Sequence, residues 1–239
     1  MLIFAHRGAR DRAPENTMAA FQAGYDLGAA GIELDVQLSR DGEVVVIHDH
    51  TVDRTSNGHG RVADLSLAEL KQLDFGAWFS PEFAGETIPT LDEVLAWLAP
   101  LPLIVNVEIK NTPIAYPGIE EKVAALLRRH LKDQVASRAA VSSFHHPCLR
   151  RLKAIAPEIP TALLFACHPI DPVRLAAEAG AAALHPNWEC LDRSWVAKAQ
   201  AAGLAVRAYT VNSEEAHRLA IAAGVDAIFT DHADKWCCR

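Results

Sequence analysis

The 239-residue sequence has no long hydrophobic run and no excess of basic residues. Its apolar stretches stay well short of the roughly 20 residues that a membrane-spanning helix requires. Its formal net charge is −7, whereas proteins that bind nucleic acid or anionic lipid present basic patches. We therefore expect no nucleic-acid partner and no stable association with membranes.

We expect neither a disulfide framework nor an N-terminal leader. Its five cysteines are odd in number and mostly scattered, which is typical of a protein from a reducing compartment. A strand-like run begins at Leu2, so no charged segment and apolar segment of a leader precede it. Together these features favour a cytoplasmic protein.

Strand-like apolar runs alternate with amphipathic helical patterns along almost the whole sequence. The runs that we interpret as parallel strands are residues 2–5, 32–36, 103–109, 139–143, 161–165, 181–185, 205–209 and 227–229. Repeated strand–helix units in a chain of this length predict an α/β fold, a (β/α)8 TIM barrel that occupies residues 1–239 as a single domain. A doubly wound sheet is the alternative. It would be favoured by a phosphate-binding glycine loop after the first strand, and residues 6–8 match that motif poorly.

A ninth apolar run and a long irregular segment interrupt this alternation. Residues 44–47 follow the pair Asp41 and Gly42, and an Asp-Gly pair is a signal for a tight turn between antiparallel strands. We therefore expect a β-hairpin that returns along the second strand. The following segment, about residues 49–89, is rich in glycine and contains several aromatic residues. We expect it to be an insertion on the C-terminal face of the barrel and not a separate domain.

Three acidic residues stand at the ends of two strand-like runs that we expect to be neighbours. Glu33 and Asp35 are two residues apart, so their side chains point to the same face of a strand, and Glu108 ends a later run. Charge is costly to bury unpaired, and one bound divalent cation is the simplest compensation. Hard oxygen ligands suit Mg²⁺ or Ca²⁺, and both ions accept this ligand set. A purely structural cluster of salt bridges is the alternative.

Two histidines and two cationic residues stand at the same predicted edge. Two histidines, three carboxylates and two cations placed in this way indicate a metal-assisted phosphoryl-transfer site. Cleavage of a phosphodiester requires one group that removes a proton from the nucleophile and one that protonates the leaving oxygen. His6 and His48 can divide these tasks, because an imidazole has a pKa near ~6.5. Arg7 and Lys110 can balance the negative charge of a phosphodiester. The alternative role for Lys110 is only to neutralise Glu108.

Six short motifs together resemble the glycerophosphodiester phosphodiesterase family. They are H-R-G at residues 6–8, P-E-N-T at 14–17, E-x-D at 33–35, H-D at 48–49, D-R-T-S-N-G at 53–58 and E-x-K at 108–110. The resemblance covers nearly the whole chain and is closest to the cytoplasmic bacterial type. It implies that His6 and His48 are the acid–base pair and that Glu33, Asp35 and Glu108 hold the divalent metal.

The resemblance also suggests finer roles. Many family members have Trp where Tyr209 stands, which implies a contact between Tyr209 and the glycerol or the head group. A further resemblance, to the related phosphatidylinositol-specific phospholipases C, implies that His6 is the base and His48 the acid.

The function predicted from these residues is metal-dependent hydrolysis of small glycerophosphodiesters, such as glycerophosphocholine or glycerophosphoethanolamine, to glycerol 3-phosphate and an alcohol. This chemistry belongs to glycerol and lipid metabolism. One alternative keeps the chemistry but acts on lysophospholipids at a membrane surface, as a lysophospholipase D does, with Trp78, Phe79 and Phe83 as an exposed apolar lip. The interpretation that we favour is that these three residues pack the insertion onto the barrel. A second alternative is a barrel that binds phosphodiesters without catalysis.

Overall fold

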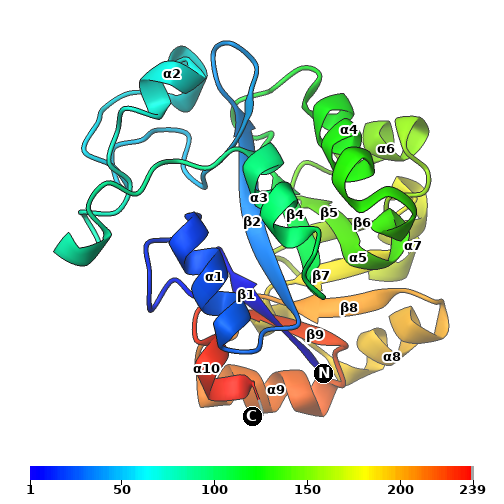
Figure 1. Cartoon of the computed structure of the whole chain (residues 1–239). Coiled ribbons are helices and arrows are strands. Elements are labelled where there is room, and N and C mark those ends of the chain that lie inside the picture. Colours follow the sequence, from blue (N-terminus) through cyan, green and yellow to red (C-terminus); the bar gives the residue numbers. More distant parts are fainter. Residues whose placement is uncertain (238–239) are drawn as a thin grey trace.

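The computed structural model describes residues 1–237 and shows a closed barrel of parallel strands surrounded by helices (Figure 1). The barrel strands are β1 (Leu2–His6), β2 (Gly31–Leu38), β4 (Ile104–Ile109), β5 (Ala139–Ser143), β6 (Thr161–Phe165), β7 (Ala183–Pro186), β8 (Ala205–Ala208) and β9 (Ala227–Thr230). Strand β1 pairs with both β2 and β9, which closes the sheet on itself. The predicted (β/α)8 TIM barrel is confirmed, and the doubly wound sheet is wrong.

Helices cover the outer side of the barrel. They are α1 (Met18–Asp26), α3 (Leu91–Leu98), α4 (Ile119–Leu131), α5 (Val135–Arg138), α6 (His146–Ile155), α7 (Pro172–Ala179), α8 (Arg193–Ala201), α9 (Glu214–Ala223) and α10 (Ala233–Trp236). One further short helix, α2 (Leu67–Leu70), lies away from the barrel in the segment after β3 (Val44–Val46) (Figure 1). Outward-facing strand residues such as Leu34, Val107 and Leu163 pack with the helices in the main hydrophobic core. Among the described residues, no helix has both the length and the apolar character that crossing a bilayer would require.

Local sequence explains where several of these helices begin and end. The Thr90 hydroxyl accepts a hydrogen bond from the Glu93 backbone, and the Glu93 carboxylate accepts one from the Thr90 backbone, so a capping box opens α3. Gly180 and Gly224 end α7 and α9 with positive φ angles of 68° and 78°, the conformation that glycine adopts most easily.

A small aromatic layer fills the inside of the barrel below its C-terminal mouth. The rings of Phe4 on β1 and Phe229 on β9 lie 5.3 Å apart, and both side chains are buried. The guanidinium of Arg207 on β8 lies 5.5 Å from the centre of the Phe4 ring. This layer forms a floor beneath the polar residues that end the strands.

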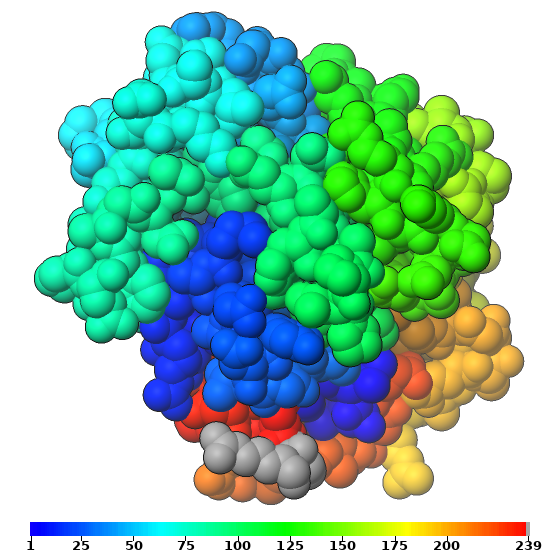
Figure 2. All heavy atoms as spheres, in the orientation of Figure 1, coloured from blue at the N-terminus to red at the C-terminus, as the bar shows by residue number. Residues whose placement is uncertain are grey.

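The predicted hairpin is present. Strand β3 (Val44–Val46) pairs antiparallel with β2, with Val36 opposite Val46. The segment that follows carries α2 and two short 3-10 turns, and it has its own small core that includes Val45, Ile47 and Phe75. Because Val45 and Ile47 stand in or beside β3, the hairpin connects this core to the barrel. Figure 2 shows the segment (cyan) in one continuous surface with its neighbours.

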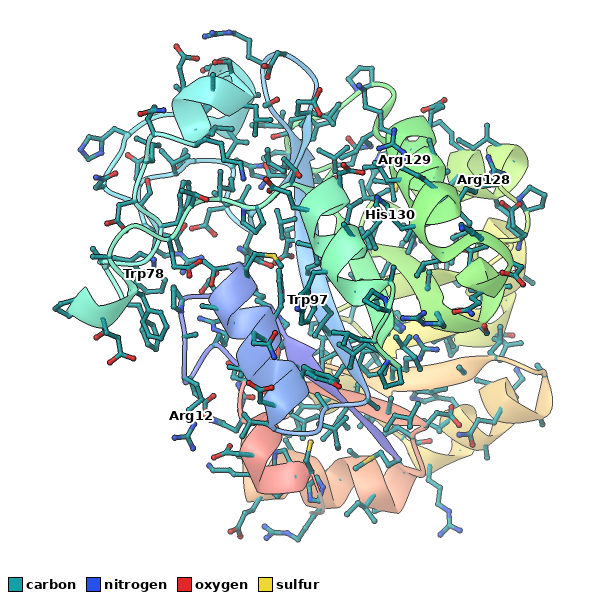
Figure 3. The ribbon with its side chains drawn as sticks, viewed as in Figure 1. Arg12, Trp78, Trp97, Arg128, Arg129 and His130 are labelled. Carbon is teal, nitrogen blue, oxygen red and sulfur yellow. The ribbon has the colours of Figure 1, made fainter. Side chains whose placement is uncertain are left out.

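The aromatic residues of this segment form a chain of ring contacts of which one end is exposed. Trp78 is 41% exposed, and Figure 3 shows it near the outer end of the segment. Its ring makes an edge contact with Phe79, which makes another with Phe83, at centroid distances of 5.8 and 5.7 Å. Within the described residues, none of the three belongs to a core cluster, and their ring contacts are with one another.

Candidate active site

The strand register brings the predicted acidic residues together at the C-terminal mouth of the barrel. His6 at the end of β1 stands opposite Glu33 on β2, and Asp35 on β2 stands opposite Glu108 on β4. One carboxylate oxygen from each of the three acids lies within 4.8 Å of the others. All three side chains are buried or nearly so. Neighbouring parallel strands therefore produce the cluster that the sequence pattern indicated.

Burial and mutual repulsion strongly affect how these acids ionise. Burial and the neighbouring charges of Asp35 and Glu108 raise the pKa of Glu33 well above its ordinary value. Burial also raises the pKa of Glu108. Burial acts on Asp35 in the same direction, but the charges of Lys110 and Arg7 outweigh it and hold the pKa of Asp35 below its usual range. The protein's own cations thus compensate the cluster only in part.

The donor set of this cluster fits a hard divalent cation. It offers three carboxylate oxygens, the ligand type of Mg²⁺ and Ca²⁺. One of them, Asp35 Oδ1, is buried and accepts no hydrogen bond from the described residues, and Lys110 Nζ lies 3.3 Å from it as an ion pair. A cation between the acids would satisfy this oxygen and remove the repulsion between Glu33 and Glu108.

Each predicted catalytic histidine is held by an aspartate through the same ring nitrogen. His6 Nδ1 lies 2.7 Å from Asp231 Oδ1, and His48 Nδ1 lies 2.7 Å from Asp49 Oδ1. Because a carboxylate accepts the proton of Nδ1, Nε2 remains available for proton transfer. Burial lowers the pKa of both imidazoles.

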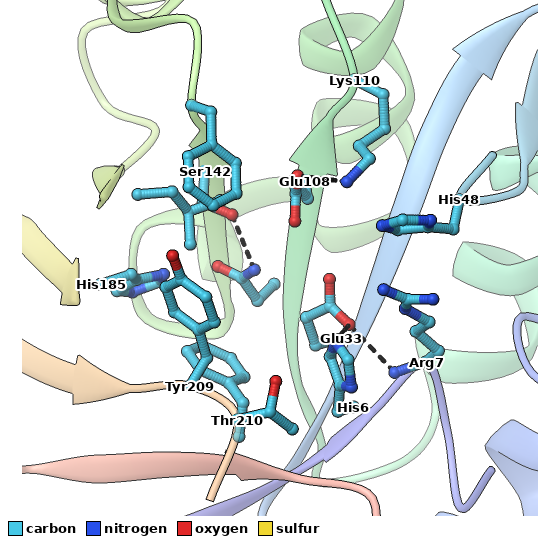
Figure 4. Close-up of a pocket in the computed structure, with 14 residues that line it drawn as sticks. His6, Arg7, Glu33, His48, Glu108, Lys110, Ser142, His185, Tyr209 and Thr210 are labelled. Atoms are coloured by element: carbon cyan, nitrogen blue, oxygen red, sulfur yellow. Dashed lines mark hydrogen bonds and ion pairs between the residues drawn. The ribbon is translucent and has the colours of Figure 1, made fainter. Parts of the chain in front are cut away.

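Figure 4 shows His6 and His48 on either side of Arg7, with Glu33 and Glu108 beside them. The two imidazoles therefore face one pocket from the end of β1 and from the bend after β3, at separate positions around the same space.

The remaining predicted residues also line this pocket. Lys110 Nζ donates to Glu108 Oε1 at 2.7 Å, so the neutralising role for Lys110 is present in the structure. Arg7 lies beside Asp35, with Nε 3.4 Å from Oδ2. Tyr209 stands on the other wall, where its hydroxyl donates to the Phe165 carbonyl and its ring meets Phe144 edge-on.

The structure adds supporting residues that sequence reasoning missed. The Asp231 carboxylate is itself fixed by Asn212, whose side-chain amide donates to Asp231 Oδ2 at 2.8 Å. The Glu15 side chain, which is only 2% exposed, accepts from Arg7 at 2.9 Å and from Arg54 at 2.8 Å. Burial opposes ionisation of Glu15, but these arginines lower its pKa to about 2. The P-E-N-T motif was the only sequence signal for Glu15, and it indicated no role.

Gln37 on β2 fixes the backbone that carries His48. Its Nε2 donates to the carbonyls of Ile47, His48 and Asp49, at 3.0, 3.0 and 2.7 Å. Its Oε1 accepts from the Tyr116 hydroxyl at 2.7 Å. A fully buried amide thereby ties the end of the hairpin to the barrel wall. The sequence signal that could have indicated Gln37 is its position two residues after Asp35, which places both side chains on the same face of the strand.

Comparison with known proteins agrees with this geometry. Residues 6–235 match the model of the glycerophosphoryl diester phosphodiesterase family. The chain belongs to this family. A glycerophosphodiester phosphodiesterase of Caldanaerobacter subterraneus subsp. tengcongensis is 44% identical over 230 residues, which cover 96% of this chain and 93% of that protein. With relatives of this similarity, the chain is an enzyme of the family, and the interpretation as a non-catalytic barrel is not supported.

Solved structures agree on the fold. A phosphodiesterase of Oleispira antarctica, in complex with the product sn-glycerol-3-phosphate, has a TM-score of 0.87 and 34% identity, and the match covers 98% of this chain and 94% of that chain. A glycerophosphodiester phosphodiesterase of Agrobacterium tumefaciens has a TM-score of 0.84 and 34% identity, covering 98% and 97% of the two chains.

Replacing Gln37 by methionine tests how the position of His48 is maintained. The three carbonyls lose a buried donor, so the free energy of unfolding should fall by about 1–3 kcal/mol. Phosphodiesterase kcat should fall about 10- to 100-fold, because the imidazole loses its fixed position. Divalent ions should raise the melting temperature of the variant as much as that of the wild type, since the acids are unchanged and a bound ion stabilises only the folded site.

The matched control for this experiment is Gln22→Met, which replaces an amide on α1 whose Nε2 bonds to Asp26 in an exposed position. Its kcat should stay at the wild-type value. A Gln37→Met enzyme with wild-type kcat would show that Gln37 does not position His48.

Proposed function

We propose that this enzyme hydrolyses water-soluble glycerophosphodiesters, such as glycerophosphocholine or glycerophosphoethanolamine, to glycerol 3-phosphate and an alcohol. The observation that carries the proposal is the meeting, in one pocket, of two aspartate-paired imidazoles, three acids and two cations. The pocket has a cavity volume of about 240 Å³, a size that suits a small ligand. The glycerol 3-phosphate bound by the Oleispira relative supports the product.

In this proposal Glu33, Asp35 and Glu108 hold one divalent cation, Mg²⁺ or Ca²⁺. When bound, the cation would polarise the phosphoryl group as a Lewis acid. Arg7 and Lys110 lie beside the same acids and balance the remaining charge of the phosphodiester.

The two imidazoles divide the proton transfers. His6 Nε2 removes a proton from the nucleophile, and Asp231 stabilises the imidazolium that forms. His48 Nε2 gives a proton to the leaving oxygen, and Asp49 holds the ring. The nucleophile is either the glycerol 2-hydroxyl, which gives a cyclic phosphate that water then opens, or water itself.

Exposed Trp78 and its partners Phe79 and Phe83 favour a second candidate function, the cleavage of lysophospholipids at a membrane surface. The small polar pocket supports the soluble substrate instead.

We also propose that the barrel and the segment of about residues 49–89 form one domain. The core of that segment includes Val45 and Ile47 at the barrel hairpin, and Gln37 bonds to the backbone at its start.

Amide variants test the metal site without changing its shape. Glu33→Gln, Asp35→Asn and Glu108→Gln each remove one charged ligand, and each should weaken Mg²⁺ or Ca²⁺ binding and lower kcat at least about 100-fold. Calorimetry measures the binding, and release of glycerol 3-phosphate before and after chelation measures the activity. The control Glu178→Gln alters an exposed acid on α7 and should bind as the wild type does. Full activity after exhaustive chelation would contradict metal dependence.

Substrate choice separates the two candidate functions. Glycerophosphocholine should be hydrolysed without detergent, and long-chain lysophosphatidylcholine in vesicles should react at least about 100-fold more slowly, because most of the residues that line the pocket are polar or charged and suit a small polar substrate. Trp78→Ala should leave glycerophosphocholine turnover unchanged. A preference for lysophosphatidylcholine that Trp78→Ala removes would establish the membrane-surface function.

Leaving groups of different basicity distinguish the roles of the histidines. A choline alkoxide requires a proton to leave, whereas a nitrophenolate barely does. His48→Ala should therefore lose ~10²–10⁴-fold on glycerophosphocholine and far less on a nitrophenyl ester of the same phosphoglycerol. His6→Ala should lose activity equally on both esters. If the nitrophenyl ester instead rescues His6→Ala, the two roles are reversed.

A further inference from the structure

One wall of the pocket carries buried polar groups that the proposed mechanism does not use. His185 on β7 lines the pocket and is 0% exposed. Neither of its ring nitrogens has a hydrogen-bond partner among the described residues. In Figure 4, His185 and Ser142 lie on one side of the pocket, and Arg7 and Lys110 lie on the other, with Glu33 and Glu108 between them.

A second unpartnered group belongs to the same pocket. Asn106 on β4 is 2% exposed, and its Nδ2 donates to Ser142 Oγ at 2.9 Å. This bond fixes the orientation of the amide and leaves Oδ1 as a buried acceptor, for which the described residues provide no donor. Leaving a buried donor or acceptor unpaired costs free energy, so groups of this kind point to a ligand that pairs with them.

The chemistry of this wall is neutral. Burial, assisted by the charge of Arg207, drives the pKa of His185 well below its ordinary value, so the imidazole presents one donor and one acceptor without charge. The ring of Phe229 lies 5.0 Å from the His185 ring and supplies an apolar side. A neutral wall of this kind suits a hydroxyl group, which both donates and accepts. The opposite side, with Arg7 and Lys110, suits a phosphate.

We propose that His185 and Asn106 form a subsite for the terminal hydroxyl of the substrate's glycerol. The inference rests on the proposed function and deepens it. The hydroxyl accepts a hydrogen bond from the N–H of the His185 ring and donates one to Asn106 Oδ1, so the glycerol lies toward this wall. The phosphate then lies toward Arg7, between His6 and His48. The subsite selects phosphodiesters that carry a free glycerol end over those that do not.

The test compares glycerophosphocholine with its analogue in which the terminal CH₂OH of glycerol is replaced by CH₃. The analogue keeps the secondary hydroxyl, the phosphodiester and the choline. The wild type should prefer glycerophosphocholine about 10- to 100-fold in kcat/KM, since a site built to bond a hydroxyl rejects the analogue that lacks it. His185→Phe keeps a ring of similar size but no nitrogen, so its kcat/KM should fall about tenfold or more on glycerophosphocholine and stay nearly constant on the analogue.

The matched control is His146→Phe on α6, which removes an imidazole that bonds to the Leu164 carbonyl and does not line the pocket. It should keep the full preference. An equal loss on both substrates, or no loss on either, in His185→Phe would overturn the subsite. If His185→Phe fails to fold, Asn106→Leu provides the same comparison with the same contrary outcomes.

Binding measurements distinguish failure of the subsite from failure of the proposed function. In calorimetry, His185→Phe should bind glycerol 3-phosphate about tenfold more weakly than the wild type does, and inorganic phosphate equally well. A wild type that cleaves neither glycerophosphocholine nor its analogue would overturn the proposed function. The comparison of glycerol 3-phosphate binding with phosphate binding would still decide whether the subsite exists. Equal weakening for glycerol 3-phosphate and phosphate would overturn the subsite.

Discussion

The burial of three like-charged carboxylates at the barrel mouth is the constraint on which the rest of the site depends. Glu33, Asp35 and Glu108 lie on adjacent strands, where solvent cannot screen their repulsion. Arg7 and Lys110 compensate part of this charge, while burial and the neighbouring carboxylates raise the pKa values of Glu33 and Glu108. A divalent cation held by the three acids, as we propose, would complete the balance, because the repulsion between these carboxylates favours a cation between them.

Around this cluster, each of the two candidate catalytic histidines is held by an aspartate that is itself held by another side chain. Asp231 orients His6 and is fixed by Asn212. Asp49 orients His48 and is bound by Arg54, whose other contact is Glu15. Such paired restraints limit the number of ring orientations, and proton transfer depends strongly on orientation. The mouth is therefore positioned before substrate arrives.

The hairpin has a structural role that the barrel alone could not fill. Strand β3 returns along β2 and brings His48 to the same mouth that His6 reaches from β1. Gln37 bonds to three successive carbonyls at that return, which limits movement of the segment. Charged groups thus gather on one side of the pocket. The far wall, with His185 and Asn106, carries no charged side chain of its own within the described part of the chain. In our proposal this asymmetry orients the substrate, with its phosphate toward the charged side and its glycerol toward the neutral side.

The sequence by itself determined the barrel, the hairpin and the identity of the strand-end residues, because alternation and i, i+2 spacing report which face a side chain occupies. It also indicated that Glu33, Asp35 and Glu108 would meet, since parallel strands end at one edge. Only the tertiary structure decided which distant groups pair, such as His6 with Asp231, 225 residues away. It alone revealed that buried His185 has no hydrogen-bond partner within residues 1–237, because periodicity describes faces of elements and not the contents of a closed interior.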